Sequence, residues 1–223
     1  MPRRPAVSFS PEHWGVLAST NPFSDQFGID RGTPIDRIFI DTFINQHSSL
    51  IRGQVLEIGD DRYSRRYVGD VTATDIVDVD PDNGSATLVA DLARPGSLPL
   101  ERYDCAIVTQ TLQYVADLET AMHNLCDCLI PGTGALLATV PGIARVDPGN
   151  GRPGDRWRFT PRGLFDLLAG VFAPDEIACV GYGDLHTATA FLYGLAAEDV
   201  GLASGAERTS DFPVVVCARA VRR

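Results

Sequence analysis

From residue 54 onward, short apolar runs rich in Val, Ile and Ala alternate with stretches that have helical spacing. Strands that are buried on both sides lack a polar face, so this alternation is typical of a parallel sheet covered by helices. Seven runs have the length and composition of such strands: 54–58, 73–79, 86–89, 104–109, 135–140, 176–181 and 214–220. We therefore predict an α/β fold, doubly wound around a mostly parallel seven-stranded sheet with helices on both faces.

Three helices accompany these strands. Residues 117–129 carry one apolar face and are followed by a Pro- and Gly-containing turn, and Thr160 before Pro161 marks the start of a second helix. A third helix, within 34–51, precedes the first strand. We expect it to pack across the sheet edge or the mouth of the site.

One long segment, 141–158, interrupts the alternation. It contains four Gly and three Pro and follows the end of a strand. Ligands of open α/β sheets bind beyond the carboxyl ends of the strands, so this segment is interpreted as a substrate loop or lid. The alternative is a surface insertion without a role in binding.

Composition narrows the function. Acidic residues outnumber basic ones by 29 to 19, and the net charge of −10 argues against nucleic-acid binding. All the basic residues are Arg, which excludes lysine Schiff bases, phosphate-loop lysines and lysine general bases. No apolar run approaches the roughly 20 residues that cross a bilayer, and the five cysteines suit reduced thiols. We expect a cytoplasmic protein without nucleic-acid or membrane partners. Its 223 residues fit one domain, with 1–52 as an N-terminal helical cap or flap and 53–223 as the core.

The first strand ends in Gly59, and Asp78 follows about 20 residues later at the end of the second strand. A Gly at the first strand-to-loop turn and an acid at this distance can bind a nucleoside through backbone amides and the ribose hydroxyls. Asp60 and Asp61 would repel the pyrophosphate of NAD at this turn. The same charges attract a nucleoside that carries a sulfonium and an ammonium group.

Four segments in this order resemble the ligand-binding segments of class I S-adenosylmethionine-dependent methyltransferases: 56–59 (LEIG), 78–81 (DVDP), 90–92 (ADL) and 103–115 (YDCAIVTQTLQYV). The resemblance spans roughly 54–172 and implies a Rossmann-like fold, with S-adenosylmethionine as cofactor and S-adenosylhomocysteine as product. More narrowly, 31–37 (RGTPIDR) and 155–160 (DRWRFT) resemble segments of small bacterial methyltransferases found beside glycosyltransferases.

The resemblance also implies which residues contact the cofactor. Glu57 and Gly59 would lie at its methionine and ribose side, Asp78 at the ribose hydroxyls, Asp91 and Leu92 at the adenine edge, and Thr109 and Gln110 at the floor near the methyl group. Asp80 competes with Asp78, which the family spacing favours. No metal site is predicted, because 78–89 lacks the glycine and the closing glutamate of a calcium loop.

The sequence departs from the family at two positions where the pattern has glycine, occupied here by Asp61 and Tyr63. A backbone approaches a ligand most easily at glycine, so these residues alter the methionine end of the site. Arg62 or Arg65 can meet the cofactor carboxylate there, or remain solvated.

On the acceptor side, methyl transfer needs alignment, exclusion of water and removal of a proton, but no covalent nucleophile. His186 and His13 are the candidate bases, and Arg37, Trp157 and Arg158 the candidate substrate contacts. A cluster of arginines in and after the long segment either binds an anionic group or is ordinary surface charge: Arg152, Arg156, Arg158 and Arg162.

These observations predict a methyltransferase that acts on a small polar acceptor, such as a sugar or natural-product hydroxyl, either as a monomer or as a homodimer. One alternative is another reaction on the same fold, namely a cyclase or a carboxyl or amine methyltransferase. The other is a non-catalytic nucleoside-binding module.

Overall fold

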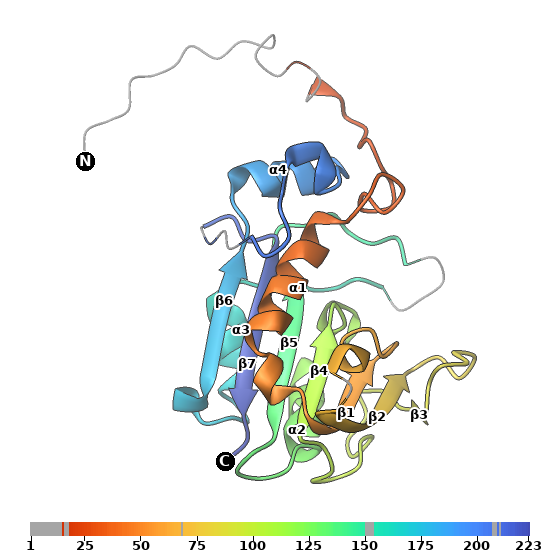
Figure 1. Ribbon diagram of the computed structural model, residues 1–223, viewed down its shortest axis with the longest axis vertical. Coiled ribbons are helices and arrows are strands. Elements are labelled where there is room, and N and C mark those ends of the chain that lie inside the picture. Colours follow the sequence, from red (N-terminus) through yellow and green to blue (C-terminus); the bar gives the residue numbers. More distant parts are fainter. Residues whose placement is uncertain (1–14, 16–17, 68, 150–153, 207–208, 210) are drawn as a thin grey trace.

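The computed structural model describes residues 15, 18–67, 69–149, 154–206, 209 and 211–223. A single seven-stranded sheet with the order β3-β2-β1-β4-β5-β7-β6 runs through the molecule (Figure 1). Its strands are β1 (Gly53–Ile58), β2 (Val71–Asp78), β3 (Leu88–Val89), β4 (Cys105–Thr109), β5 (Ala135–Pro141), β6 (Ile177–Tyr182) and β7 (Val215–Val221). All seven predicted strands are confirmed. Only β7 is antiparallel to its neighbours, so the sheet is mostly parallel as predicted.

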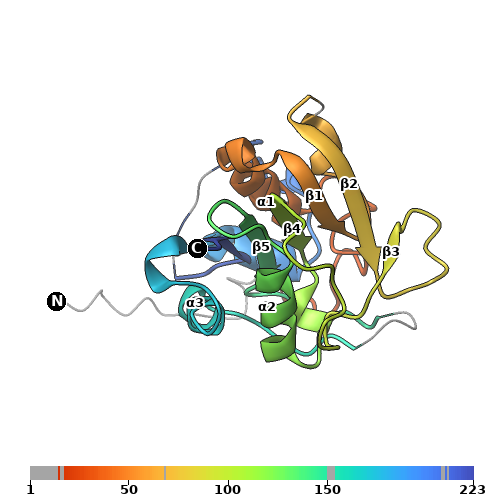
Figure 2. The same cartoon turned by 90° about the horizontal axis from the view of Figure 1, so that it is seen from below.

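Helices cover both faces of this sheet. They are α1 (Ile35–Gln46), α2 (Leu118–Asp127), α3 (Pro161–Leu168) and α4 (Leu185–Leu192), with short 3-10 turns at η2 (Ser48–Leu50), η3 (Ser64–Tyr67), η4 (Leu112–Tyr114), η5 (Pro174–Glu176) and η6 (Glu198–Val200). Figure 2 shows α1 on one side of the strands and α2 and α3 on the other. Two apolar clusters fill the two interfaces, and the side chains of β5 between them are buried along its whole length.

Local capping explains where the helices begin. The Asp117 carboxylate accepts a hydrogen bond from the backbone N–H of Thr120 at the start of α2. The Thr160 hydroxyl accepts one from the N–H of Gly163, and Pro161 occupies the first position of α3. Both predicted helix starts are confirmed. In α4, Asp184 and Thr187 form a reciprocal capping box, and the sequence analysis did not predict this helix.

The prediction that segment 34–51 packs across the sheet edge or the mouth of the site is only partly right. Phe39 and Phe43 of α1 are fully buried in the same cluster as Val55 of β1 and Cys217 of β7. This apolar stripe holds α1 flat against one face of the sheet, because only there is it removed from water. The first turn of α1 alone reaches the carboxyl ends of the strands.

Among the described residues, no helix has the length and apolar character needed to cross a membrane. The same residues contain no group of His, Cys, Asp and Glu side chains arranged to hold a metal ion.

Candidate functional site

The polar residues singled out in the sequence gather where β1 and β4 end. These two strands lie side by side in the sheet. On the far side of β1 come β2 and then β3, and on the far side of β4 come β5, β7 and β6. The winding therefore reverses between them, and open α/β sheets bind their ligands at such a switch point. Two cavities of about 150 Å³ and 280 Å³ lie here, and Arg37 and Gln110 line both of them.

The smaller cavity is bounded by the ends of β1 and β4 and by the loop after β1. Gly59, Thr109 and Gln110, which the resemblance predicts at the cofactor, are brought together in its wall. Gly59 has a φ of +83°, and a Cβ atom added there would meet no other atom within 4 Å. Gln110 also has a positive φ, +47°, which is uncommon for a residue with a side chain. Such backbone strain is concentrated at functional sites in proteins.

Glu57 shapes the loop that lines the smaller cavity. Its side chain is 1% exposed, and its two oxygens accept hydrogen bonds from the backbone N–H groups of Tyr63, at 2.9 Å, and Ser64, at 2.8 Å. Burial raises the pKa of this carboxyl, although the two N–H groups act in the opposite direction. Because both of its oxygens accept hydrogen bonds from this loop, Glu57 braces the cavity wall.

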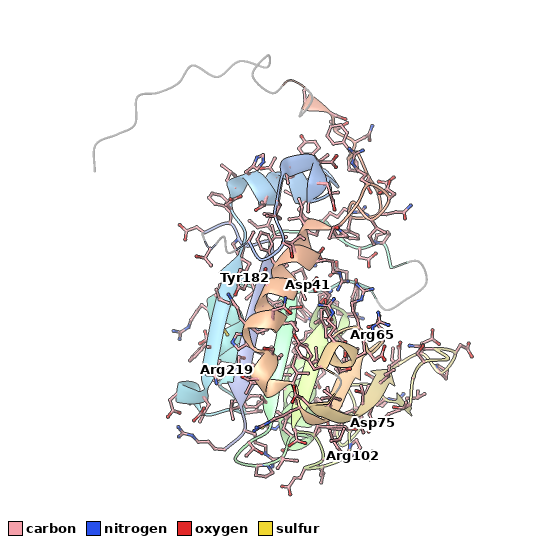
Figure 3. The ribbon with its side chains drawn as sticks, in the orientation of Figure 1. Asp41, Arg65, Asp75, Arg102, Tyr182 and Arg219 are labelled. Atoms are coloured by element: carbon pink, nitrogen blue, oxygen red, sulfur yellow. The ribbon has the colours of Figure 1, made fainter. Side chains whose placement is uncertain are left out.

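Tyr63 replaces a glycine of the family pattern without filling the cavity. Its ring is 1% exposed and belongs to the apolar cluster under α1, while its hydroxyl lies 3.4 Å from Nη1 of Arg37. Asp61, at the other departure, lies 3.7 Å from Arg65, which is labelled in Figure 3. Arg62 lines the smaller cavity and Arg65 does not, so the structure brings Arg62 to the predicted methionine end.

The side-chain amide of Asn83 links Asp78 to Gly59. The side-chain NH₂ of Asn83 donates to Asp78 Oδ2, at 2.7 Å, and to the carbonyl of Gly59, at 2.9 Å. The carboxylate of Asp80 is exposed and accepts from the N–H of Asp82 in the following turn. Asp78 is thus linked to Gly59 through Asn83, and its preference over Asp80 as the ribose contact stays a prediction. Asn83 thus holds the two strand ends together.

Asp91 and Leu92 lie outside both cavities, in the loop between β3 and β4. Asp91 accepts a hydrogen bond from the N–H of Ala93, and Leu92 is buried in the core. The buried Asn124 of α2 fixes this loop by donating to the carbonyls of Leu92 and Arg94. Sequence reasoning missed Asn124, whose only indication was an amide on the otherwise apolar face of a helix.

The larger cavity has walls from several separate parts of the chain. They include Phe27 and Ile29, the first turn of α1, Gln110 and the turn η4, the segments 141–149 and 154–158, Phe191 of α4 and Val214. The long Gly- and Pro-containing segment therefore does line a pocket, through Arg145, Asp147, Asp155 and Arg158 among others.

Arg158 is fixed in this wall by an ion pair. Its Nη1 and Nη2 atoms donate to the two oxygens of Asp155, at 2.5 and 2.6 Å, and its Nε donates to the carbonyl of Ala144. The Asp155 side chain is 3% exposed. Burial acts to raise the pKa of Asp155, but the hydrogen bonds from Arg158 and from the Asp147 N–H outweigh it and lower the pKa below its usual value. Both members of this pair also bond to the first half of the long segment, Arg158 to the carbonyl of Ala144 and Asp155 to the N–H of Asp147, and so they join its two halves.

Other predicted acceptor-side residues do not reach the cavities. The indole N–H of Trp157 donates to the carbonyl of Val115, and the ring is 41% exposed outside both pockets. His186 is exposed in the first turn of α4 and lines neither cavity. His13 and Arg152 lie outside the described residues.

Asp36 is the acid that sequence reasoning missed. It lies in the first turn of α1, next to Arg37, and lines the larger cavity. Burial raises its pKa, although the charges of Arg37 and Arg62 lower it. Burial acts to lower the pKa of the Arg37 guanidinium, but interactions with Asp36 and Tyr63 outweigh burial and raise this pKa. The sequence pointed to Asp36 through its position in the segment 31–37, which carries the narrower resemblance.

The comparisons with known proteins establish the fold. No family model and no curated protein matches the chain. An S-adenosylmethionine-dependent methyltransferase of Thermotoga maritima aligns with a TM-score of 0.59 and 16% identity, over 87% of this chain and 95% of that one. The [4+2]-cyclase SpnF aligns with a TM-score of 0.55 and 12% identity, over 91% and 86%. The N-methyltransferase NodS of Bradyrhizobium japonicum aligns with a TM-score of 0.52 and 16% identity, over 85% and 97%. The chain thus has the Rossmann-like α/β fold of these proteins, which support more than one reaction.

Proposed function

We propose that the chain is an S-adenosylmethionine-dependent methyltransferase that acts on a hydroxyl group of a small polar molecule, such as a sugar or a natural product. The observation that carries the proposal is the pair of cavities at the switch point, which share Arg37 and Gln110 as a common wall. One cavity suits a methyl donor and the adjoining one suits an acceptor. Adjoining cavities that share lining residues can bring two reactants into contact, as a direct displacement requires.

The residues of the smaller cavity fit the proposed cofactor. Open space at Gly59 lets a ligand approach the backbone closely. Arg37 and Arg62 can bind a carboxylate, and Asp60 can bind an ammonium group. Asp78, beside Gly59, is placed for the ribose hydroxyls that the resemblance assigns to it. When bound, S-adenosylmethionine supplies an electrophilic methyl group.

The residues around the larger cavity shape its wall and exclude water. Asp155 and Arg158 close its wall, and Phe27 and Phe191 give it apolar surface that excludes water. Tyr114 donates to Asp147 at 2.6 Å and so holds another part of the same wall. The finer resemblance to methyltransferases found beside glycosyltransferases favours a sugar as the acceptor.

The test is isothermal titration calorimetry of the full chain with S-adenosylhomocysteine, S-adenosylmethionine and NAD. We expect saturable binding of the first two ligands and none of NAD, because the carboxylate of Asp60, which lines the smaller cavity, would repel a pyrophosphate there. Binding of NAD without a response to either adenosyl ligand would contradict the proposal. Cofactor binding together with rearrangement of a substrate, and no methyl transfer, would favour a cyclase.

A further inference from the structure

Buried polar atoms without hydrogen-bond partners converge on the larger cavity. The described residues contain six buried side-chain N or O atoms of this kind. Four of them belong to residues that line this one cavity: Asp36 Oδ1, Gln110 Nε2, Gln113 Oε1 and Arg145 Nε. Leaving such an atom unpaired costs about 1–3 kcal/mol, so proteins keep few of them without a use.

The four atoms are complementary in chemistry. Gln110 Nε2 and Arg145 Nε are donors, whereas Asp36 Oδ1 and Gln113 Oε1 are acceptors. A ligand that satisfies both kinds must donate and accept within a small volume. Hydroxyl groups do this, since each carries one donor and two acceptor positions. An ammonium ligand would leave the donors unpaired, and a carboxylate ligand would leave the acceptors unpaired.

Two of these side chains can turn toward a ligand at small cost. The atoms of Asp36 and Gln110 are on terminal carboxyl or amide groups, whose last torsion is soft. The Gln113 amide is anchored instead, because its Nε2 donates to the carbonyl of Gln110 at 2.9 Å. Arg145 is held by a hydrogen bond to the carbonyl of Asp25 and lies 4.2 Å from the centre of the Phe27 ring.

Asp36 differs from the other acids of the cavity in having an oxygen to spare. Asp147 accepts from Tyr114 and from the N–H of Gly149, and Asp155 is paired with Arg158. No described histidine lines either cavity. The charged groups nearest Asp36 are Arg37, on its own helix, and Arg62, on the loop after β1.

We infer that the larger cavity is the binding site for a neutral, polyhydroxylated acceptor and that Asp36 accepts the proton of the hydroxyl that is methylated. This inference rests on the proposed function. In the step, the acceptor oxygen forms a bond to the methyl carbon as the carbon–sulfur bond breaks and its electron pair goes to sulfur. The hydroxyl proton passes to the Asp36 carboxylate, so no further reactant is needed.

The first experiment measures binding to the full chain by ligand-observed NMR with S-adenosylhomocysteine present. The probes are methyl glucoside as a neutral polyol, benzylamine as an ammonium and benzoate as a carboxylate. The test variant is Asp36→Asn. The matched control is Asp41→Asn, which makes the same change on the same helix, at a residue paired with Arg66 outside both cavities (Figure 3).

We expect the wild-type chain to bind methyl glucoside in preference to the other two probes. Asp36→Asn should weaken this binding at least about fivefold, whereas Asp41→Asn should leave it within about twofold. Equal binding by Asp36→Asn and the wild type, a preference for benzylamine or benzoate, or no binding of the glucoside would each overturn the inference.

The second experiment measures methyl transfer from S-adenosylmethionine to bound methyl glucoside by mass spectrometry. Loss of a general base lowers transfer by about 100-fold or more, while the affinity of Asp36→Asn for S-adenosylhomocysteine should stay within about twofold of wild type. Equal transfer by the variant, or no transfer by the wild type, would overturn the role of Asp36. Failure of the proposed function appears separately, as absent cofactor binding in calorimetry. The glucoside titration without cofactor then still tests the acceptor site.

Discussion

The substitution Gly59→Ala separates the stability of the loop after β1 from its use in binding. Gly59 has a φ of +83°, and a Cβ atom would meet nothing within 4 Å. The folded chain therefore loses only the energy of a left-handed backbone at a residue with a side chain, about 1–2 kcal/mol. For a domain of this size, that loss lowers the melting temperature by roughly 2–8 °C.

Gly132 offers a matched control. Its φ is +84°, a Cβ there also meets no atom within 4 Å, and it lies in the turn before β5, at the other end of the sheet. We expect Gly59→Ala and Gly132→Ala to melt at similar temperatures in scanning calorimetry. Only Gly59→Ala should weaken S-adenosylhomocysteine binding, by about tenfold or more, which corresponds to about 1.4 kcal/mol. If the two variants bind the ligand equally well, no ligand approaches the backbone at Gly59, and the placement of the cofactor is refuted.

Two further predictions concern the strand ends and the long segment. Asp78→Ala should reduce the affinity for S-adenosylhomocysteine by about 1.5–3 kcal/mol. Asp80→Ala should reduce it by much less, because Asp78 is the acid linked to Gly59. If calorimetry finds the larger effect for Asp80→Ala, the ribose contact is misassigned. In urea unfolding, Arg158→Ala should lower the free energy of unfolding by about 1–3 kcal/mol, since it removes the ion-pair partner of the buried Asp155 carboxylate. Trp157→Phe removes one exposed hydrogen bond and should lower the free energy of unfolding by about 0.5–1.5 kcal/mol. The reverse ranking would show that the ion pair does not hold the two halves of the segment together.

The central strands β4 and β5 could be predicted from the sequence because burial on both faces makes nearly every residue apolar. In β5 all seven side chains are buried, so the apolar run and the strand coincide almost residue for residue. The capping residue Thr160 gave the start of α3 for a similar local reason, since its side chain satisfies a backbone N–H group within three positions. The apolar face of residues 117–129 gave α2.

The helix α4 was missed because its composition is ambiguous. Thr187 and Thr189 are weak helix formers, and the segment has only eight residues. Asp184 followed three residues later by Thr187 was the available indication, and it forms the capping box. His186, a candidate base of the sequence analysis, belongs to this helix. In the structure the first turn of α4 exposes it.

The acceptor cavity could not be predicted because its walls come from segments far apart in the chain. Asp36, Gln113 and Arg145 acquire their common role only when α1, η4 and the long segment meet. No local pattern encodes an unpaired buried atom, since its lack of a partner depends on the whole surrounding structure. Sequence reasoning therefore reached the residues at the strand ends, which follow strand order, and chose histidines for the role that we propose for Asp36.

Tyr63 connects the two ends of the site and explains how the loop keeps its shape without glycines at 61 and 63. The Tyr63 N–H donates to Glu57, its ring packs under α1, and its hydroxyl lies near Arg37. These side-chain contacts fix the conformation of the loop. In the family pattern, glycines allow the loop conformation through the freedom of their backbone. Because Arg37 and Asp36 share the first turn of α1, a contact that fixes the cofactor loop also fixes the acceptor wall. The departure from the family pattern therefore couples the geometry of the two cavities, which is what a displacement between two bound molecules requires.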